Sequence, residues 1–166
     1  MAESENMRLD ARRDGTRLLV SLPKGDYVFC DPCCPVTSEL WARFWKKTIP
    51  IMESGEQKGG YAFPENGGKT GLLVFMYNKL GDGRYPGMDN AGNSIEFGAD
   101  TGSLGVVSMD IAASRPEWPP KAGYCFFAGP AMLGINRHGF IFVEKAGEKV
   151  VSVRPYVRED PDCDEE

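Results

Sequence analysis

The sequence predicts a β-rich α+β fold, with a compact antiparallel, barrel-like core of about eight or nine strands and one tryptophan-bearing helix. Its length of 166 residues is that of one domain. Its 20 glycines and 12 prolines exceed the usual share and favour short strands joined by many turns. Hydrophobic residues make up 42% of the chain, which is enough for one core and excludes a wholly disordered protein. We expect a single domain over 16–157, between flexible charged termini at 1–15 and 158–166.

Two short strands are predicted at the start of the domain, Arg17–Leu22 and Asp26–Cys30. The second is rich in aromatic and β-branched residues, which suit a pleated surface. Pro23 and Gly25 between them are turn residues, because proline presets φ and glycine accepts a positive φ. The two strands are therefore expected to form a hairpin.

One helix is predicted over 37–49. Thr37 or the serine after it can cap the helix, and Pro50 is expected to end it. Trp41 and Trp45 recur with other apolar residues on one face. That face can serve as a binding surface, but packing against the sheet is the simpler interpretation, because a sheet in so small a domain needs a covering helix.

The remaining strands follow a polar, glycine-rich segment, 55–70, that is predicted to be a loop. The apolar run Gly71–Asn78 predicts a strand in the centre of the sheet. Pro86-Gly87 is predicted to be a turn, and Ala146-Gly147 a two-residue hairpin turn. The other predicted strands lie at 84–85, 94–97, 104–109, 123–128, 139–145 and 149–157.

The charge balance argues against nucleic acid as a partner. The chain carries 19 basic and 24 acidic residues, a net charge of −5, and its basic residues are scattered rather than gathered in a stripe. No apolar run approaches the roughly 18–20 residues that span a bilayer, and the N-terminal segment has no apolar signal region. We therefore expect a cytoplasmic protein with neither a nucleic-acid nor a membrane partner.

Cys30, Cys33 and Cys34 form the sequence C-D-P-C-C. A structural zinc site needs four ligands, and a single C-x-x-C pair supplies two. A redox C-x-x-C opens a helix directly after a strand, whereas here the helix begins later. Reduced, partly buried thiols at a strand-to-helix turn are the simplest interpretation. We expect no cofactor and no metal, and name these three cysteines as the ligands if a metal does bind.

Asp100 lies in A-D-T-G-S at 99–103, which matches the hydrophobic-Asp-Thr-Gly-Ser motif of aspartic peptidases. There, two carboxylates of a dimer share a proton and activate water, and the glycine-rich 131–140 would supply a flap. The second half-motif of those enzymes is missing after Val157. His138, the only histidine, lies in a predicted turn, and no G-x-S-x-G elbow accompanies it. Without a complete catalytic set, we lean towards a protein that is not an enzyme.

Oxygen-bearing side chains gather between Asp82 and Asp100, which raises the possibility of a calcium loop. Their spacing fits no EF-hand. Aspartate, asparagine and glycine are also the residues of ordinary turns, and we favour that interpretation.

Three motifs stand out in the chain: L-P-K-G-D-Y-V-F-C-D-P-C at 22–33, L-G-D-G-R-Y-P at 80–86 and A-D-T-G-S-L-G-V at 99–106. They resemble motifs of the small "cytosolic DPC" proteins of phages and bacteria, a family of unknown function. The resemblance covers roughly 20–110 and includes the tryptophan-bearing helix. Cys34 stands where an aromatic residue is expected in that family. The resemblance implies a compact β-rich fold and explains D-T-G as a family turn.

The leading functional hypothesis is a non-enzymatic binding protein that engages another protein or a second copy of itself. The phage and bacterial resemblance suggests a conflict role, in anti-defence or immunity. The alternatives are a dimeric aspartic-peptidase-like hydrolase that uses Asp100, and a small-ligand-binding sponge whose pocket the helix tryptophans line. The candidate binding residues are Trp41, Trp45, Asp82, Tyr85, Asp100 and His138.

Substitution of Asp100 separates the structural and catalytic interpretations of the D-T-G motif. A turn aspartate accepts backbone N–H bonds, so Asp100→Ala should lower the free energy of unfolding by about 1–2 kcal/mol. Asp100→Asn keeps an acceptor oxygen and should cost much less. We expect this pattern, measured by thermal melts, and no peptidase activity between acidic and neutral pH. Pepstatin-sensitive cleavage that Asp100→Asn abolishes would contradict it.

Overall fold

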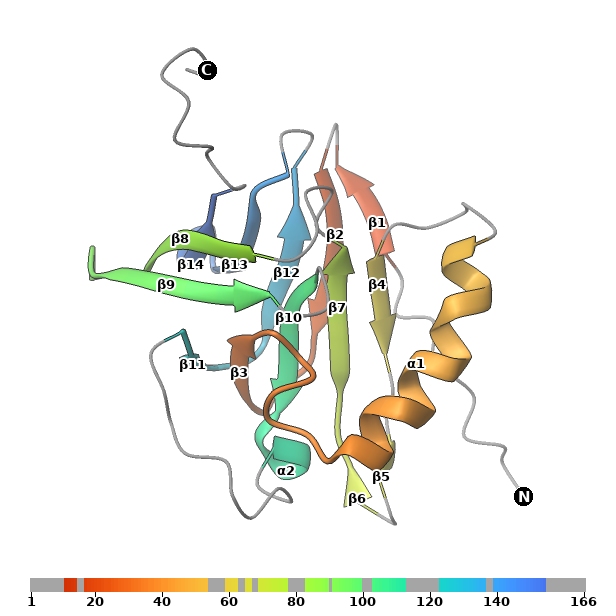
Figure 1. The fold of residues 1–166 in the computed structure, drawn as a ribbon. Coiled ribbons are helices and arrows are strands. Elements are labelled where there is room, and N and C mark those ends of the chain that lie inside the picture. The colour runs from red at the N-terminus through yellow and green to blue at the C-terminus, as the bar shows by residue number, and fades with distance from the viewer. Residues whose placement is uncertain are drawn as a thin grey trace.

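The computed structural model describes residues 11–14, 17–53, 59–62, 65–66, 69–77, 83–89, 91–99, 103–112, 123–136 and 139–154. These residues form fourteen strands and two helices. The prediction of a β-rich α+β fold is confirmed, although the strands outnumber the predicted eight or nine and the four-residue helix Met109–Ala112 was not predicted. Figure 1 shows the strands in two larger sheets, with helix α1 along one side of the molecule. No helix in this part of the chain is long and apolar enough to cross a membrane.

The largest sheet is antiparallel and has seven strands in the order β1-β2-β12-β13-β14-β8-β9. In that order, the strands are β1 (Ala11–Asp14), β2 (Arg17–Leu22), β12 (Ala131–Ile135), β13 (Ile141–Lys145), β14 (Glu148–Val153), β8 (Gly83–Asp89) and β9 (Ser94–Ala99). Part of the segment that was predicted to be a flexible N-terminus therefore belongs to this sheet, because β1 pairs with β2.

The second sheet is also antiparallel, with five strands in the order β11-β3-β10-β7-β4. In that order, the strands are β11 (Cys125–Ala128), β3 (Asp26–Cys30), β10 (Ser103–Ser108), β7 (Leu73–Tyr77) and β4 (Gly59–Ala62). A two-stranded ribbon, β5 (Glu65–Asn66) with β6 (Lys69–Thr70), completes the set. The predicted central strand is confirmed as β7, an inner strand. The predicted loop over 55–70 is wrong where β4, β5 and β6 form.

The main core lies between the two larger sheets, because both send apolar side chains into one cluster. The seven-stranded sheet contributes Tyr85 and Phe97, and the five-stranded sheet contributes Phe29, all fully buried. The rings of Phe29 and Phe97 meet edge to face, with 5.2 Å between their centroids. This is a geometry that aromatic pairs favour, and it joins the two sheets directly.

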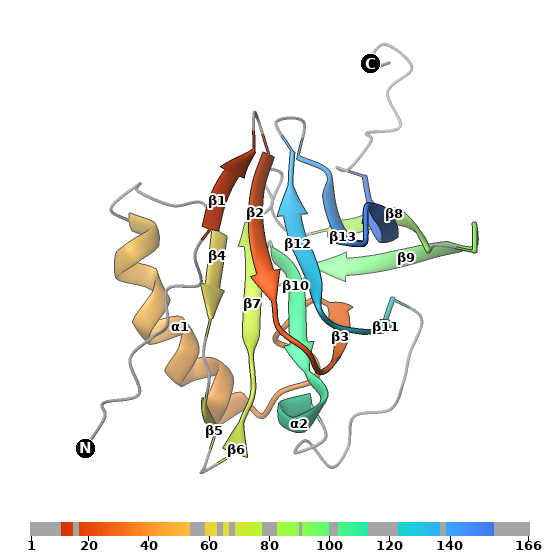
Figure 2. The ribbon, with the colours of Figure 1, turned by 180° about the vertical axis from the view of Figure 1, so that it is seen from behind.

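A second core lies on the other face of the five-stranded sheet, beneath α1 (Ser38–Glu53) and α2 (Met109–Ala112). Leu40 and Phe44 of α1 pack there against strand residues such as Phe75, whose ring centroid is 5.4 Å from that of Phe44. Figure 2 shows α1 and α2 beside that sheet from the opposite side. The sheet is thus covered on both faces, as a strand run that is almost wholly apolar requires.

Helix α1 starts as predicted and ends later than predicted. The backbone N–H of Leu40 donates to the side-chain oxygen of Thr37 at 3.1 Å, which is the hydrogen bond of an N-cap. The helix continues past Pro50 to Glu53, so the prediction that Pro50 ends it was wrong. Pro50 begins the last turn of the helix, which has four residues. The helix therefore loses one backbone hydrogen-bond donor near its end and is not broken in its middle.

The predicted hairpin of β2 and β3 was wrong, although both strands have the predicted bounds. The two strands belong to different sheets, and the short link between them is a corner. The Tyr27 hydroxyl donates to the carbonyl of Pro23 at 2.7 Å, and the N–H of Gly129 donates to the carbonyl of Gly25 at 2.7 Å. Both strands face the same main core from opposite sides, which a hairpin within one sheet would not allow.

The structure also differs from the predicted turn at Pro86-Gly87 and from the flap considered for 131–140. Pro86-Gly87 does not form a turn, since β8 runs through it. The Pro86 carbonyl accepts from the N–H of Arg154 at 2.9 Å, just beyond the end of β14. Proline has no N–H to donate, but Pro86 lies where the hydrogen-bond ladder between β8 and β14 ends, so the strand tolerates it. The glycine-rich segment at 131–140 contains strand β12 instead of a flap, and the Phe142 ring fills the space beside Gly134.

The predicted turns at the tips of two hairpins are confirmed. Ala146 and Gly147 join β13 to β14 with φ of 52° and 82°, the left-handed pair that a two-residue hairpin turn needs. The β8–β9 hairpin closes through the Asp89–Asn93 segment. The positions of both tips therefore follow from residues that tolerate positive φ or bond to their own backbone.

The glycine at position 105 tests the close contact between β10 and β7. A Cβ there would overlap the carbonyl oxygen of Val74 and approach the Cα of Phe75 to 2.7 Å. Because backbone cannot rotate away, we expect Gly105→Ala to lower the free energy of unfolding by about 1–3 kcal/mol. Gly98→Ala on β9 is the control, since nothing lies within 4 Å of its Cβ position, and it should stay within about 0.5 kcal/mol. Equal urea midpoints for the two variants would refute this packing.

Candidate functional site

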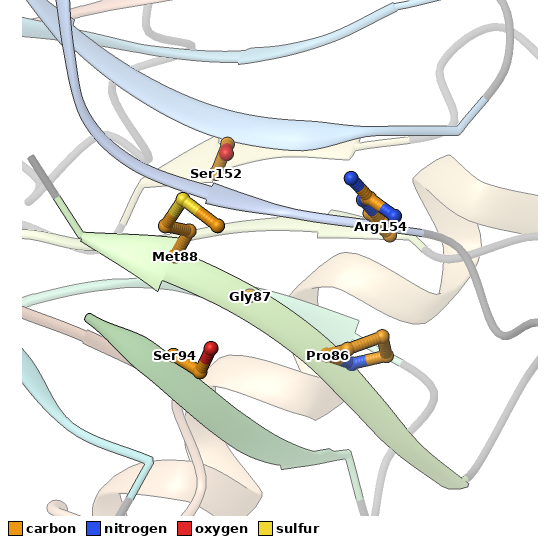
Figure 3. Close-up of a pocket in the computed structure, with 6 residues that line it drawn as sticks. All are labelled: Pro86, Gly87, Met88, Ser94, Ser152 and Arg154. Carbon is orange, nitrogen blue, oxygen red and sulfur yellow. The ribbon is translucent and has the colours of Figure 1, made fainter. Parts of the chain in front are cut away.

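A pocket of about 250 Å³ lies on the outer face of the seven-stranded sheet, where β14, β8 and β9 run side by side (Figure 3). Its walls come from strand residues at one edge of the sheet and from Arg154, which directly follows β14. The lining residues are Pro86, Gly87, Met88, Ser94, Ser152 and Arg154.

Strand alternation explains why the pocket forms here. Tyr85 points into the main core, so Met88 three positions along β8 points to solvent. Met88 pairs with Ser152 on one side and with Ser94 on the other. Two short side chains flank a long one, and Met88 is 46% exposed. The short side chains of Ser152 and Ser94 leave space on either side of Met88, and the methionine forms the apolar wall of the pocket.

The electrostatics of the pocket are dominated by one guanidinium. Glu96, on the same outer face of β9, is paired with Arg84 at 2.7 Å. Arg154 is exposed and makes no ion pair with any residue that the structure describes. The pocket therefore combines an available cation, an apolar methionine and two serine hydroxyls.

The residues that sequence analysis proposed for binding lie elsewhere. Tyr85 has an exposed fraction of 0% and belongs to the main core. Trp41 and Trp45 stack on each other, with centroids 5.6 Å apart, and pack partly buried against the second core. Neither tryptophan lines the pocket in Figure 3. Core packing, the simpler interpretation of the tryptophan face, is thus what the contacts display.

Three other proposed residues, Asp82, Asp100 and His138, lie outside the described residues. Asp100 falls between the end of β9 at Ala99 and the start of β10 at Ser103. The aspartic-peptidase hypothesis therefore stays a prediction.

The D-P-C-C sequence forms a tight turn between β3 and α1. The carbonyl of Asp31 accepts from the N–H of Cys34 at 3.1 Å, and its carboxylate accepts from the N–H of Cys33 at 3.1 Å. Proline in the second position presets φ for such a turn. As a result the two thiols stand next to each other, with 4.0 Å between their sulfur atoms. The strand-to-helix turn predicted for these cysteines is confirmed.

All the cysteines in the described part of the chain are free thiols. Burial raises the pKa of Cys30 well above its ordinary value, and the pKa of Cys125 is raised by burial as well. The pKa of Cys33 is raised first by its contact with the thiol of Cys34 and then by burial. These raised pKa values favour the protonated thiols at neutral pH, which argues against a nucleophilic thiolate.

The residues that line the pocket, above all Met88, Ser152 and Arg154, were not predicted from the sequence. Their strands were partly predicted, but no motif distinguishes them, and their proximity depends on the pairing of β14 with β8. The sequence offers one signal for Met88. It lies three positions after Tyr85 on the same strand, so if the tyrosine faces the core the methionine faces the solvent.

Comparison with known proteins found no match among protein-family models, curated proteins or solved structures.

Asp89 tests the turn interpretation of the acidic segment against a calcium loop. Its carboxylate accepts from the N–H of Asn93 at 2.8 Å and of Ala91 at 3.0 Å, and these bonds lower the pKa of Asp89 below its ordinary value. The bonds favour the ionised form, so their contribution to stability is present above the unfolded-state pKa and lost as pH falls through the lower folded-state pKa. Carboxyl-carbon NMR should show a pKa below the ordinary value that rises in Asn93→Ala, because this variant loses the side-chain amide that donates to the carboxylate at 3.1 Å. Millimolar calcium should leave the Asp89 resonance unmoved, and a saturable calcium shift would contradict the turn interpretation.

Proposed function

We propose that this chain is a non-enzymatic binding module that recognises another protein through the outer face of β14, β8 and β9. The observation that carries the proposal is the pocket itself, in which exposed Met88 stands beside Arg154, a guanidinium with no ion-pair partner among the residues that the structure describes. Exposed methionine adapts its shape to a partner, and arginine is the cation most suited to planar carboxylates.

The chemistry of the pocket selects a partner segment with a carboxylate next to an apolar side chain. The Arg154 guanidinium can hold a carboxylate through two parallel N–H···O bonds. Met88 then covers the apolar neighbour, and the hydroxyls of Ser94 and Ser152 can bond to the partner's backbone. Such a segment would also match the cationic character that Arg154 gives to this face.

The size of the pocket favours a protein over a small ligand. Sites for small molecules usually measure about 300–1,000 Å³, whereas this pocket measures about 250 Å³. One or two protein side chains would fill it. The lining residues that the structure describes include neither a carboxylate nor a histidine that could activate the serines, which supports binding rather than catalysis.

The class of partner comes from the sequence. Resemblance to small phage and bacterial proteins supports, by association, a partner in a bacterial defence or immunity system. A second copy of this chain is the other protein partner to be tested, since a β-sheet face of this kind can also join identical subunits.

Affinity capture with matched variants tests the proposal. The partner captured by the wild type from a lysate of the source organism is purified and titrated against each variant. We expect Arg154→Glu and Met88→Ser each to weaken binding at least about tenfold, as central interface residues do. Binding should also weaken with added salt.

Two substitutions outside the pocket serve as controls. Phe126→Ser changes the other large hydrophobic residue exposed in the described chain, which is on β11, and Lys24→Glu repeats the charge change in an exposed turn. Both should bind like the wild type. A partner that binds all four variants equally, or a wild-type chain whose only partner is itself through another surface, would overturn the proposed site.

A further inference from the structure

The D-P-C-C turn brings together three side chains that ligate metals. A carboxylate oxygen of Asp31 and the sulfur atoms of Cys33 and Cys34 all lie within 4.8 Å of one another. This is the one group of three or more potential ligands found among the described residues. It lies at the start of α1 and shares no residue with the pocket on the outer face of the seven-stranded sheet.

The separation of the two sulfur atoms is close to that of a metal-bound pair. Zinc binds thiolate sulfur at about 2.3 Å, so two sulfurs on a tetrahedral ion lie roughly 3.8 Å apart. The sulfur atoms of Cys33 and Cys34 are 4.0 Å apart. The turn therefore holds both thiols near the distance required, with little movement left to make.

The carboxylate is the ligand that the spacing of the cysteines does not reveal. Asp31 is only 2% exposed, and its Oδ1 atom is fixed by the N–H of Cys33. The expectation of no metal counted only the two sulfurs of a C-x-x-C pair. In the structure Cys30 faces the second core and is not part of the ligand group. The group consists instead of Cys33, Cys34 and a carboxylate oxygen of Asp31.

We propose that this turn binds one thiophilic divalent cation of the zinc type through Cys33, Cys34 and Asp31. On binding, each thiol loses its proton to the buffer, and two metal–sulfur bonds and one metal–oxygen bond form with no change of oxidation state. Thiolates prefer zinc-like ions over calcium or magnesium. Three protein ligands leave a fourth position open, and the half-buried thiols give the ion a path from solvent.

Cadmium titration of the full, reduced, chelator-treated chain tests the site. Thiolate–cadmium bonds give an ultraviolet charge-transfer band, which reports on sulfur ligands directly. We expect the band to saturate at one cadmium per chain and zinc to compete for the same site. Cys33→Ser and Cys34→Ser should each lower the cadmium affinity by at least about tenfold, because substitution of residues that merely hydrogen-bond to a metal ligand already lowers metal affinity by about that much. Asp31→Asn keeps the turn acceptor and should weaken binding without removing the band.

Cys125→Ser is the matched control, because Cys125 is a buried free thiol on β11 outside the group. It should leave the cadmium affinity unchanged within about twofold, a margin small beside the tenfold loss expected for a ligand. Far-UV circular dichroism of every variant separates loss of the ligand from loss of the fold. If the wild type gives no band at one equivalent, the proposal is wrong. The same holds if folded Cys33→Ser and Cys34→Ser both keep the wild-type affinity.

Discussion

The edge-to-face contact of Phe29 and Phe97 is the constraint from which the arrangement of this protein follows. It joins β3 of one sheet to β9 of the other across the main core, with 5.2 Å between the ring centroids. Because side chains alternate along a strand, turning Phe97 inward turns its neighbours on β9 outward. The register of β8 against β9 then places Tyr85 in the core beside Phe97 and Met88 at the surface. The outer pocket is thus a consequence of how the core is packed.

Packing also determines the structure on the other face of the five-stranded sheet, where helix α1 lies. Helix α1 covers the five-stranded sheet with its apolar stripe, so its tryptophans are occupied in packing. The turn that leads into α1 must be tight, and Asp31 closes it with both its carbonyl and its carboxylate. The closeness of the two thiols follows from that closure. A structural requirement has therefore assembled a set of ligands.

The sequence predicted those features that depend on local chemistry. The bounds of β2 and β3, the cap at Thr37 and the hairpin turn at Ala146-Gly147 were all correct. It did not predict which strands pair. The link at Pro23–Gly25 has the composition of a hairpin turn, and only the shared core of two sheets makes it a corner. The outer pocket depends on the pairing of β14 with β8, which are far apart in the chain, so no local pattern could have located it.

Site-directed photo-crosslinking at Met88 tests the proposed recognition surface in a single measurement. A photoreactive phenylalanine analogue is incorporated at Met88 in one sample and at Trp45 in another, and each is irradiated with the purified partner. We expect Met88→benzoylphenylalanine to crosslink to an acidic, partly apolar segment of the partner and Trp45→benzoylphenylalanine not to crosslink. Crosslinking from position 45 alone would contradict it and would identify the helix face as the binding surface.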